Sequence, residues 1–362
     1  MSNDKVKRWI CSSVLATTAY HVQDATDLIK LDAMENPYTW PAAIKESWLR
    51  CLERAAINRY PSADATELKD KLRRAFAIPE ELNLLLGNGS DEIIQIIIMA
   101  LSGQNAIFLT PTPTFVMYEV IAAAAQARFV GIPLQRDFTL DRVAMLRAIR
   151  DYQPAAVFLA YPNNPTGNLF NVEVITEIIE QAPGLVVVDE AYQVFAGSSL
   201  LPSIGNYDNL LIMRTMSKFG LAGLRLGYLI GPACWLRELD KLRLPYNINL
   251  LTQMTTAFIL DHIELLHEQA AAICHDRDLL YQALAAMPYI SVWPSATNFL
   301  LVRIEQGGSD RVFAGLKRAG VLVKNLHGNH LLLANCLRVT IGTPDENRLF
   351  LHALKATLQR QD

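Results

Sequence analysis

Residues 155–159 (Ala-Ala-Val-Phe-Leu) and residues 185–188 (Leu-Val-Val-Val) are the two runs that decide the fold of this 362-residue chain. Both are apolar at every position, and runs of this length and composition are typical of strands buried on both faces of a sheet. Amphipathic stretches alternate with such runs, which is the rhythm of an α/β domain. The other predicted strands here are 106–109, 210–213 and 226–230, and the predicted helices are 115–125, 140–150 and 172–181. We therefore predict a large α/β domain built on a mostly parallel sheet.

The pattern changes after Gly231, where two helical stretches, 233–242 and 251–287, come first. The shorter elements that follow are predicted strands at 290–293, 299–302, 321–323 and 337–341, and helices at 309–319 and 345–358. They predict a smaller α+β domain, which the N-terminal residues complete. The predicted division assigns residues 41–250 to the large domain, and residues 1–40 and 251–362 to the small domain.

The composition excludes several classes of function. The net charge is −3, from 33 basic and 36 acidic residues without a dense basic block, so we expect neither a nucleic-acid nor a membrane partner. The longest apolar run, residues 93–101, is far shorter than a bilayer span. The five cysteines lie far apart with no Cys-x-x-Cys pair, which favours reduced thiols and a cytoplasmic protein. His262, His267 and His275 share a predicted helix but not one face of it, so we expect no metal site.

Candidate functional residues follow the predicted strands, where open α/β sheets bind their ligands. Residues 86–92 (Leu-Gly-Asn-Gly-Ser-Asp-Glu) precede an apolar helix. The glycines allow close approach of a ligand, Ser90 or Asp91 can cap the helix, and free amides at its start can bind a phosphate. A helix start without a ligand explains the same residues, and the third glycine of a dinucleotide fingerprint is absent.

Residues 160–167 (Ala-Tyr-Pro-Asn-Asn-Pro-Thr-Gly) follow the strand 155–159. Asparagine, proline and glycine are the expected residues of a turn. The alternative is functional, because the side-chain amide of Asn164 at the carboxyl end of a strand can donate a hydrogen bond to a ligand oxygen. Both interpretations fit the sequence.

The strand 185–188 ends in Asp189 and Glu190, with Tyr192 close behind. A carboxylate at the end of a buried strand is costly unless it faces a cation or a metal. One alternative is an acid that binds a metal ion in a nucleotide hydrolase, but the sequence has no Gly-Lys-Ser/Thr loop to accompany it. The other alternative is a helix cap. We favour a carboxylate that faces a buried cation.

Residues 214–228 (Arg-Thr-Met-Ser-Lys-Phe-Gly-Leu-Ala-Gly-Leu-Arg-Leu-Gly-Tyr) are the most informative segment. Hydroxyl groups and arginine suit a phosphate, while an enclosed lysine can lose its proton and act as a nucleophile. A basic surface loop is the competing interpretation, but the apolar residues Phe219, Leu221 and Leu224 disfavour it.

Pyridoxal 5′-phosphate is a ligand that suits all of these groups together. It needs a nucleophilic lysine, a carboxylate that faces the ring cation, a phenol, an amide and a phosphate cradle. The chain resembles the fold-type-I pyridoxal-phosphate aminotransferases, and within them the histidinol-phosphate aminotransferase family. The resemblance runs from residues 31–38 (Leu-Asp-Ala-Met-Glu-Asn-Pro-Tyr) to residues 337–343 (Leu-Arg-Val-Thr-Ile-Gly-Thr). Ser-Lys at 217–218 and Asn-Pro-Thr-Gly at 164–167 are typical of the superfamily.

The resemblance implies roles for the residues around the cofactor. Lys218 would bind the cofactor covalently and move a proton during the reaction. Asp189 would pair with the ring nitrogen, Tyr192 and Asn164 would bond the ring hydroxyl, and Phe115 would stack on the ring, although an ordinary core phenylalanine also fits. The residues implied for the cofactor phosphate are Ser90, Asp91, Thr215, Ser217, Arg225 and, from the other subunit of a homodimer with shared sites, Tyr60.

The resemblance also implies substrate-binding residues, namely Arg338, Tyr20, Asn36 and Lys324. Arg338 would pair with the carboxylate of the amino donor or with the phosphate of histidinol phosphate, since its fork suits both anions. The chain departs from the family at Lys324, where many members carry a second arginine. The chain also departs from the family at Lys218-Phe219-Gly220, which is one residue shorter than the common form. This affects the helical phase of Arg225 relative to Lys218.

These features predict an enzyme that transfers an amino group reversibly between L-histidinol phosphate and 2-oxoglutarate in histidine synthesis. The alternatives on the same scaffold are an aminotransferase for aromatic or other amino acids and a threonine-phosphate decarboxylase. A non-catalytic binding protein is a further alternative, because a fold does not imply a function. The joint presence of Lys218, Asp189, Tyr192 and Arg225 argues against it.

Overall fold

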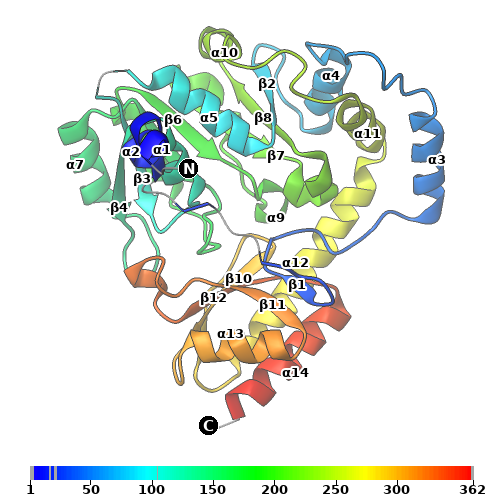
Figure 1. Cartoon of the computed structure of the whole chain (residues 1–362), viewed down its shortest axis with the longest axis vertical. Coiled ribbons are helices and arrows are strands. Elements are labelled where there is room, and N and C mark those ends of the chain that lie inside the picture. Colours follow the sequence, from blue (N-terminus) through cyan, green and yellow to red (C-terminus); the bar gives the residue numbers. More distant parts are fainter. Residues whose placement is uncertain (1–3, 16–17, 20–22, 104, 360–362) are drawn as a thin grey trace.

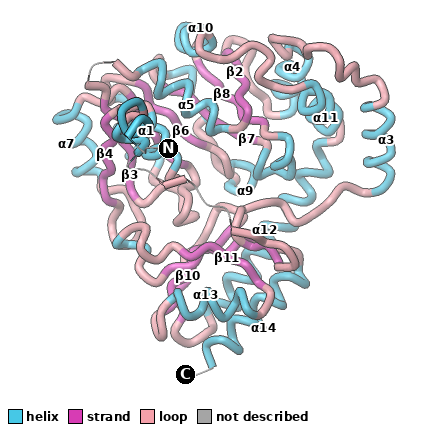
Figure 2. Tube along the Cα trace, viewed as in Figure 1, coloured by secondary structure: helices cyan, strands magenta, loops and turns pink. Residues whose placement is uncertain are grey.

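The computed structural model describes residues 4–15, 18–19, 23–103 and 105–359, and their strands form two separate sheets, visible as two groups of strands in Figure 2. The strands are β1 (Ile29–Leu31), β2 (Asn83–Asn88), β3 (Ile107–Thr112), β4 (Arg128–Pro133), β5 (Ala156–Ala160), β6 (Leu185–Asp189), β7 (Leu210–Thr215), β8 (Leu226–Gly231), β9 (Ile290–Val292), β10 (Phe299–Ile304), β11 (Val321–Asn325) and β12 (Cys336–Thr340). The longer helices are α3 (Ala42–Leu52), α4 (Thr66–Ala75), α5 (Ser90–Leu101), α6 (Met117–Ala124), α7 (Arg142–Tyr152), α8 (Val172–Gln181), α10 (Ala233–Asp240), α11 (Leu250–Leu260), α12 (Ile263–Ala285), α13 (Ser309–Arg318) and α14 (Pro344–Gln359).

The larger sheet has seven strands in the order β2-β8-β7-β6-β5-β3-β4. All neighbouring strands are parallel except β8, which runs antiparallel to β2 and β7. Every residue of β5, β6, β7 and β8 is buried, as expected for strands covered on both faces. Figure 1 shows helices on both sides of this sheet, so the predicted mostly parallel α/β architecture is confirmed.

The sequence analysis missed two strands of this sheet. Strand β2 includes Gly87, within the glycine-containing residues 86–92 that precede the apolar helix, and β4 is an edge strand whose apolar run is interrupted by Arg128 and Gly131. Neither has the continuous apolar pattern that marks the central strands.

The smaller sheet has the order β1-β11-β12-β10-β9, and α13 and α14 pack beside it (Figure 1). Strand β1 pairs with β11 in parallel, which brings residues 29–31 to a sheet otherwise built from the last quarter of the chain. The strands of the large sheet lie within residues 83–231. The predicted domain boundaries at residues 41 and 250 remain predictions.

The helix predicted over 251–287 was wrong, because the chain forms two helices that break near Asp261. The backbone N–H groups of Asp261 and His262 donate three residues back instead of four, which tightens the end of α11. The Lys71 ammonium group donates to the Ala257 carbonyl at 2.9 Å and to the Asp261 carboxylate. These bonds satisfy groups at the end of the helix, and no glycine or proline marks the break in the sequence.

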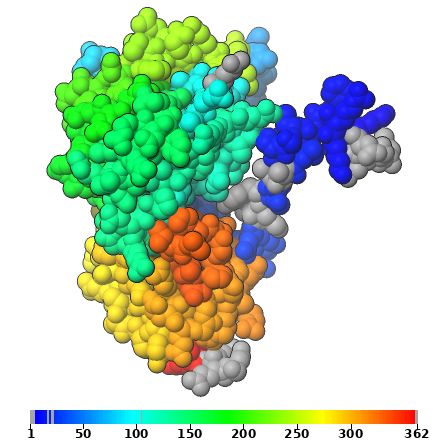
Figure 3. Space-filling model, turned by 90° about the vertical axis from the view of Figure 1, so that its left-hand side faces the viewer, coloured from blue at the N-terminus to red at the C-terminus, as the bar shows by residue number. Residues whose placement is uncertain are grey.

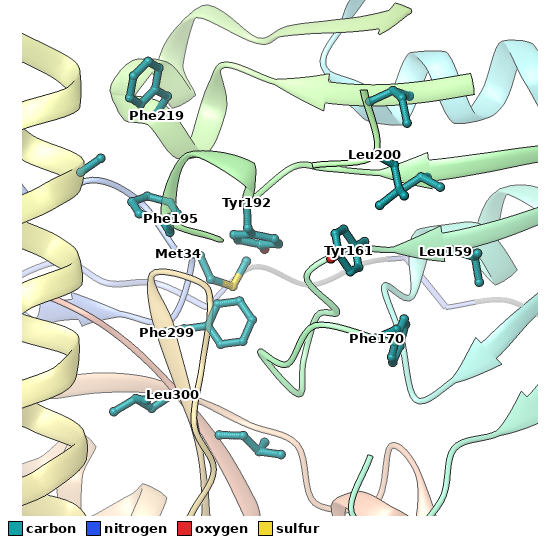
Figure 4. Close-up of a cluster of buried hydrophobic side chains, with 14 of the residues drawn as sticks. Met34, Leu159, Tyr161, Phe170, Tyr192, Phe195, Leu200, Phe219, Phe299 and Leu300 are labelled. Atoms are coloured by element: carbon teal, nitrogen blue, oxygen red, sulfur yellow. The ribbon is translucent and has the colours of Figure 1, made fainter. Parts of the chain in front are cut away.

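The two sheets meet around Met34, on the segment between β1 and α3. Its backbone N–H donates to Thr340 Oγ1 at 2.9 Å, and its carbonyl accepts from Asn298 Nδ2 at 3.0 Å. Figure 4 shows its side chain beside Tyr192, which follows strand β6 of the large sheet, and Phe299 of the small sheet. The rings of Tyr192 and Phe299 meet edge to face, with centroids 5.3 Å apart. This contact fixes the junction at which the candidate residues gather.

The N-terminal helices α1 (Asp4–Trp9) and α2 (Ser12–Leu15) stand out from the body of the molecule (Figure 3). The Trp9 side chain is 77% exposed. Across the described residues, we find no helix with the length and apolar character needed to cross a bilayer.

Candidate active site

The carboxyl ends of the central strands open into a pocket with about 550 Å³ of empty volume, solvent at its mouth included. The pocket brings together ten residues predicted from the sequence, namely Ser90, Asp91, Phe115, Asn164, Asp189, Tyr192, Thr215, Ser217, Lys218 and Arg225. They come from five different segments of the chain, so only the fold makes them neighbours.

Lys218 follows β7 in the turn Ser217–Leu221, which Gly220 makes possible with φ at 113°. Its ammonium group donates to the Ala33 carbonyl at 3.2 Å. Burial, followed by the positive charge of Arg338, lowers the pKa of Lys218 from 10.5 to about 8. The lysine therefore reaches its neutral, nucleophilic form far closer to neutral pH than an exposed lysine does.

Asp189 ends β6 with a buried carboxylate. The Tyr118 hydroxyl donates to Asp189 Oδ2 at 2.6 Å, and the Ala191 N–H donates to Oδ1 at 3.0 Å. Burial raises the pKa of Asp189 to about 6, while these two hydrogen bonds favour its ionised form. Among the described residues, no cationic side chain lies within ion-pair distance of Asp189, which suits a carboxylate that faces a cation brought by a ligand.

The buried protein cation expected near these acids pairs with Glu190 instead. The Arg214 Nε and Nη2 atoms each lie 2.9 Å from Glu190 Oε2, and both side chains are almost completely enclosed. The Ser199 hydroxyl and the Leu200 N–H also donate to Glu190. The pair joins the ends of β6 and β7 and has its hydrogen bonds satisfied, as a buried ion pair requires.

A phosphate-sized cradle lies at the other end of the pocket. Thr215 Oγ1 donates to Ser217 Oγ at 3.0 Å, and Arg225 Nη1 donates to the same Ser217 oxygen at 3.3 Å. Arg225 also pairs with Asp91 at 3.3 Å, so the shorter Lys218-Phe219-Gly220 segment still brings Arg225 to the cradle. The 12-residue helix α5 begins here, and its first N–H groups add a partial positive charge.

Helix α5 begins differently from the sequence expectation. Its N-cap is Gly89 at φ 84°, and neither Ser90 nor Asp91 makes a side-chain cap bond. The Asn88 N–H donates instead to Glu92 Oε2 at 2.6 Å. The glycine is needed because a Cβ atom at Gly89 would lie 2.6 Å from Arg225 Nη2. The side chains of Ser90 and Asp91 therefore face the pocket and are not used to cap the helix.

A second hollow adjoins the first and shares Met34, Phe115 and Asn164 with it. Arg338 and Lys324, on neighbouring strands of the small sheet, line its far side. Arg338 Nη1 donates to Asn164 Oδ1 at 2.7 Å, and Nη2 donates to the Asp32 carbonyl at 2.9 Å. The first bond orients the Asn164 amide so that Nδ2 is the atom available as a donor.

Two of the remaining predicted residues, Asn36 and Tyr60, lie outside both hollows. Asn36 lines neither hollow: its Nδ2 donates to Gln269 and its Oδ1 accepts from the Tyr38 N–H, at 2.9 Å each. Tyr60 is 81% exposed and stacks on Tyr246 with ring centroids 4.5 Å apart. Tyr20 lies outside the described residues. The roles predicted for all three stay predictions.

The structure adds residues that sequence reasoning missed. Tyr118 binds Asp189, Met34 lines both hollows, and the carbonyls of Asp32 and Ala33 bind Arg338 and Lys218. Backbone carbonyls carry no sequence signal. Tyr118 had only a weak one, since it stands three residues after Phe115 in a mostly apolar helix.

The residues present fit pyridoxal phosphate. Lys218 would bind its aldehyde, Asp189 its ring nitrogen, and the cradle around Ser217 and Arg225 its phosphate. Gly227 lets β8 approach the start of α5 closely, because a Cβ atom at this position would lie 2.6 Å from the Ser90 nitrogen. Burial raises the pKa of Tyr192 well above its usual range, so its hydroxyl remains a hydrogen-bond donor.

Comparison with known proteins agrees with this cofactor, and the matches cover nearly the whole chain. Residues 26–354 match the family model of class I and II aminotransferases. Histidinol-phosphate aminotransferase 2 of Nitrosococcus oceani is 52% identical over 356 residues, which is 98% of this chain and 99% of that protein. Histidinol-phosphate aminotransferase 1 of Ralstonia nicotianae is 49% identical over 362 residues, covering 99% of this chain and 96% of the relative.

A solved structure shares the fold. It is the histidinol-phosphate aminotransferase of Sinorhizobium meliloti in complex with pyridoxal-5′-phosphate, which superposes with a TM-score of 0.86 at 22% identity and covers 97% of this chain and 98% of its own. The fold, the whole-length match to the family model and two relatives at about half identity agree. This chain belongs to the class I and II aminotransferases, whose cofactor is pyridoxal phosphate, and within them to the histidinol-phosphate aminotransferase family.

Proposed function

We propose that the protein transfers an amino group reversibly between L-histidinol phosphate and 2-oxoglutarate, giving imidazole acetol phosphate and glutamate. The observation that carries this proposal is the pair of adjoining hollows. One presents Lys218 and Asp189, and the other presents Arg338 and Lys324. Both substrates are amines or ketones that carry an anionic group, and two cations beyond the reacting centre suit such molecules.

Each of these side chains has a separate role in the reaction. Bound pyridoxal phosphate supplies an aldehyde that links to amines and a ring that accepts electrons. Lys218 Nζ would hold the cofactor and later carry the proton of the substrate carbon. Asp189 would hold the proton on the ring nitrogen, and Arg338 would fix the substrate anion so that this carbon faces Lys218.

The test is the visible spectrum of the purified protein before and after addition of L-histidinol phosphate alone. We expect a yellow protein whose visible band disappears as the cofactor takes up the amino group, and 2-oxoglutarate should restore it. Bleaching by an aromatic amino acid but not by L-histidinol phosphate would keep the amino transfer and change the substrate. Release of carbon dioxide from threonine phosphate would favour the decarboxylase.

We propose further that the protein is a homodimer in which Tyr60 completes the cofactor site of the partner subunit. Tyr60 is a large aromatic residue that is 81% exposed and lies outside its own pocket, although the matching tyrosine of the family binds cofactor phosphate. Nearby, Ile57 and Leu244 are also exposed, as expected for residues that a partner covers.

This dimer predicts complementation between two defective variants. We expect co-expressed Tyr60→Ala and Lys218→Ala chains to give mixed dimers in which one of the two sites has both side chains. Their activity, measured at limiting cofactor, should exceed that of either variant alone. The control is a matched mixture of Lys241→Ala and Lys218→Ala chains. It shows how much activity mixed dimers reach when Tyr60 is intact in both chains. If the first mixture shows no gain over its parents, each subunit works without Tyr60 of the other.

We also propose the division into a large domain, 41–250, and a small domain, 1–40 with 251–362, and a cytoplasmic location. The separate sheets support the division. The location is supported by five free cysteines, which are typical of reducing compartments.

A further inference from the structure

Tyr118 is a buried polar side chain that none of the roles above uses. It lies in α6, is 1% exposed, and reaches the end of β6 from the neighbouring layer. Its hydroxyl donates to Asp189 Oδ2 at 2.6 Å. A hydrogen bond of this length to a carboxylate is of the strong, charge-assisted kind.

The Tyr118 ring is held in place independently of its hydroxyl. It stacks on Phe158 with centroids 5.0 Å apart at an interplanar angle of 17°. It also meets Phe115 edge to face at 5.6 Å and 87°. Phe115 lines the cofactor pocket, whereas Tyr118 does not. Tyr118 therefore contacts two pocket residues, Asp189 and Phe115, from outside the pocket.

Asp189 depends on this contact because its environment otherwise disfavours a negative charge. Its other oxygen has one partner, the Ala191 N–H. Burial is the main cause that raises the pKa of Asp189, and the Tyr118 hydrogen bond is the main cause that lowers it. The titratable and charged groups around Asp189 are Tyr118 on α6, Asp91 on α5, Glu190 and Tyr192 after β6, and Lys218, which lines the same pocket after β7.

We propose that Tyr118 is a positioning residue of the cofactor site: its hydroxyl orients the Asp189 carboxylate toward the ring nitrogen, and its ring supports Phe115 beneath the same ring. The inference rests on the proposed function, since it requires that Asp189 and Phe115 face the cofactor. It concerns a side chain that acts through its neighbours and does not touch the cofactor.

The test is the dissociation constant of pyridoxal phosphate, measured by equilibrium binding between pH 5 and pH 9 on the apoprotein. Asp189 must be ionised to hold the proton on the ring nitrogen, so affinity falls as the pH drops through the pKa of Asp189. Removing the hydroxyl in Tyr118→Phe raises that pKa further. We expect the acid side of the binding curve to move up by about one pH unit, so that affinity falls about threefold at pH 6.5 and about tenfold at pH 5.

Tyr161→Phe is the matched control. Tyr161 is also buried, and its hydroxyl pairs with Ser198 at 2.9 Å, so the change removes a buried tyrosine hydroxyl close to the site without touching Asp189. We expect its binding curve to overlay that of the wild type. This separates loss of orientation at Asp189 from a general effect of losing a buried hydrogen bond.

Two results would overturn the inference while leaving the proposed function intact. One is a Tyr118→Phe curve that overlays the wild type. The other is a Tyr118→Phe apoprotein that loses the circular dichroism of the folded protein, because the position of the ring would then depend on the hydroxyl. A wild-type protein that binds no pyridoxal phosphate at any pH would overturn the proposed function, and this inference with it.

Discussion

Replacing Lys218 with alanine is expected to abolish amino transfer and to leave the fold intact. No other described side chain in the pocket combines a nucleophilic nitrogen with a lowered pKa, and at about 8 that pKa leaves roughly a tenth of Lys218 neutral at pH 7. The variant should bind pyridoxal phosphate without the visible band of a lysine-bound cofactor. Turnover with L-histidinol phosphate and 2-oxoglutarate should fall at least about 10⁴-fold, since both the covalent link and the proton carrier are lost.

Stability supplies the control for this variant. Because burial disfavours the charged form of Lys218, removing the ammonium group also removes a cost of folding below pH 8. Its single hydrogen bond, to the Ala33 carbonyl, is a smaller loss. We therefore expect the melting temperature of the Lys218→Ala apoprotein to equal or exceed that of the wild type at pH 7. Near-normal transaminase activity in this variant would contradict the whole assignment of the site.

Replacing Arg338 with alanine is expected to weaken both half-reactions. Arg338 lines the second hollow and donates to Asn164, which both hollows share, and its fork can bind either a carboxylate or a phosphate. We expect KM for glutamate and for L-histidinol phosphate each to rise about 100-fold, the effect of losing roughly 3 kcal/mol of charge-assisted hydrogen bonding. Single-turnover bleaching with each amino donor measures the two half-reactions separately.

Two further variants make the Arg338 result specific. Arg338→Lys keeps the charge without the fork and should fall between alanine and the wild type. Arg303→Lys makes the same change on the neighbouring strand β10, where the guanidinium lies over Trp293 outside both hollows, and should leave KM unchanged. If Arg338→Ala impairs only one donor, the carboxylate and the phosphate bind at separate sites.

The sequence predicts the central part of the fold and most of the cofactor pocket for a physical reason. Strands such as β6 are apolar throughout because they are buried on both faces, and their polar ends stand out against that background. Lys218, Asp189 and Arg225 belong to such ends or to the glycine-containing turns beside them. Each is a residue type that burial penalises, so its position after a strand indicates a function.

The remaining parts depend on contacts that a linear pattern does not carry. Tyr118 stands in a mostly apolar helix, and only the packing of α6 on the sheet brings its hydroxyl to Asp189. The break between α11 and α12 is stabilised by Lys71, almost two hundred residues earlier in the chain. Strand pairing and long-range hydrogen bonds decide both features, and local periodicity is silent on them.

The pairing of Glu190 with Arg214 constrains how this chain can vary in length. Glu190 lies beside Arg214, and Asp189 beside Met213, in the register of β6 and β7. Successive residues of a strand point to opposite faces, so Asp189 and Thr215 face the pocket while their chain neighbours Glu190 and Arg214 form the ion pair on the other side.

Deleting or inserting a single residue within either strand would exchange the two rows. One member of the ion pair would then turn toward the cofactor and leave its partner buried without a counter-charge, and the cofactor-binding residue of that strand would turn into the protein interior. Insertions and deletions in the histories of such chains should therefore be confined to the loops before β6 and β7, where a change in length does not alter which face a side chain occupies.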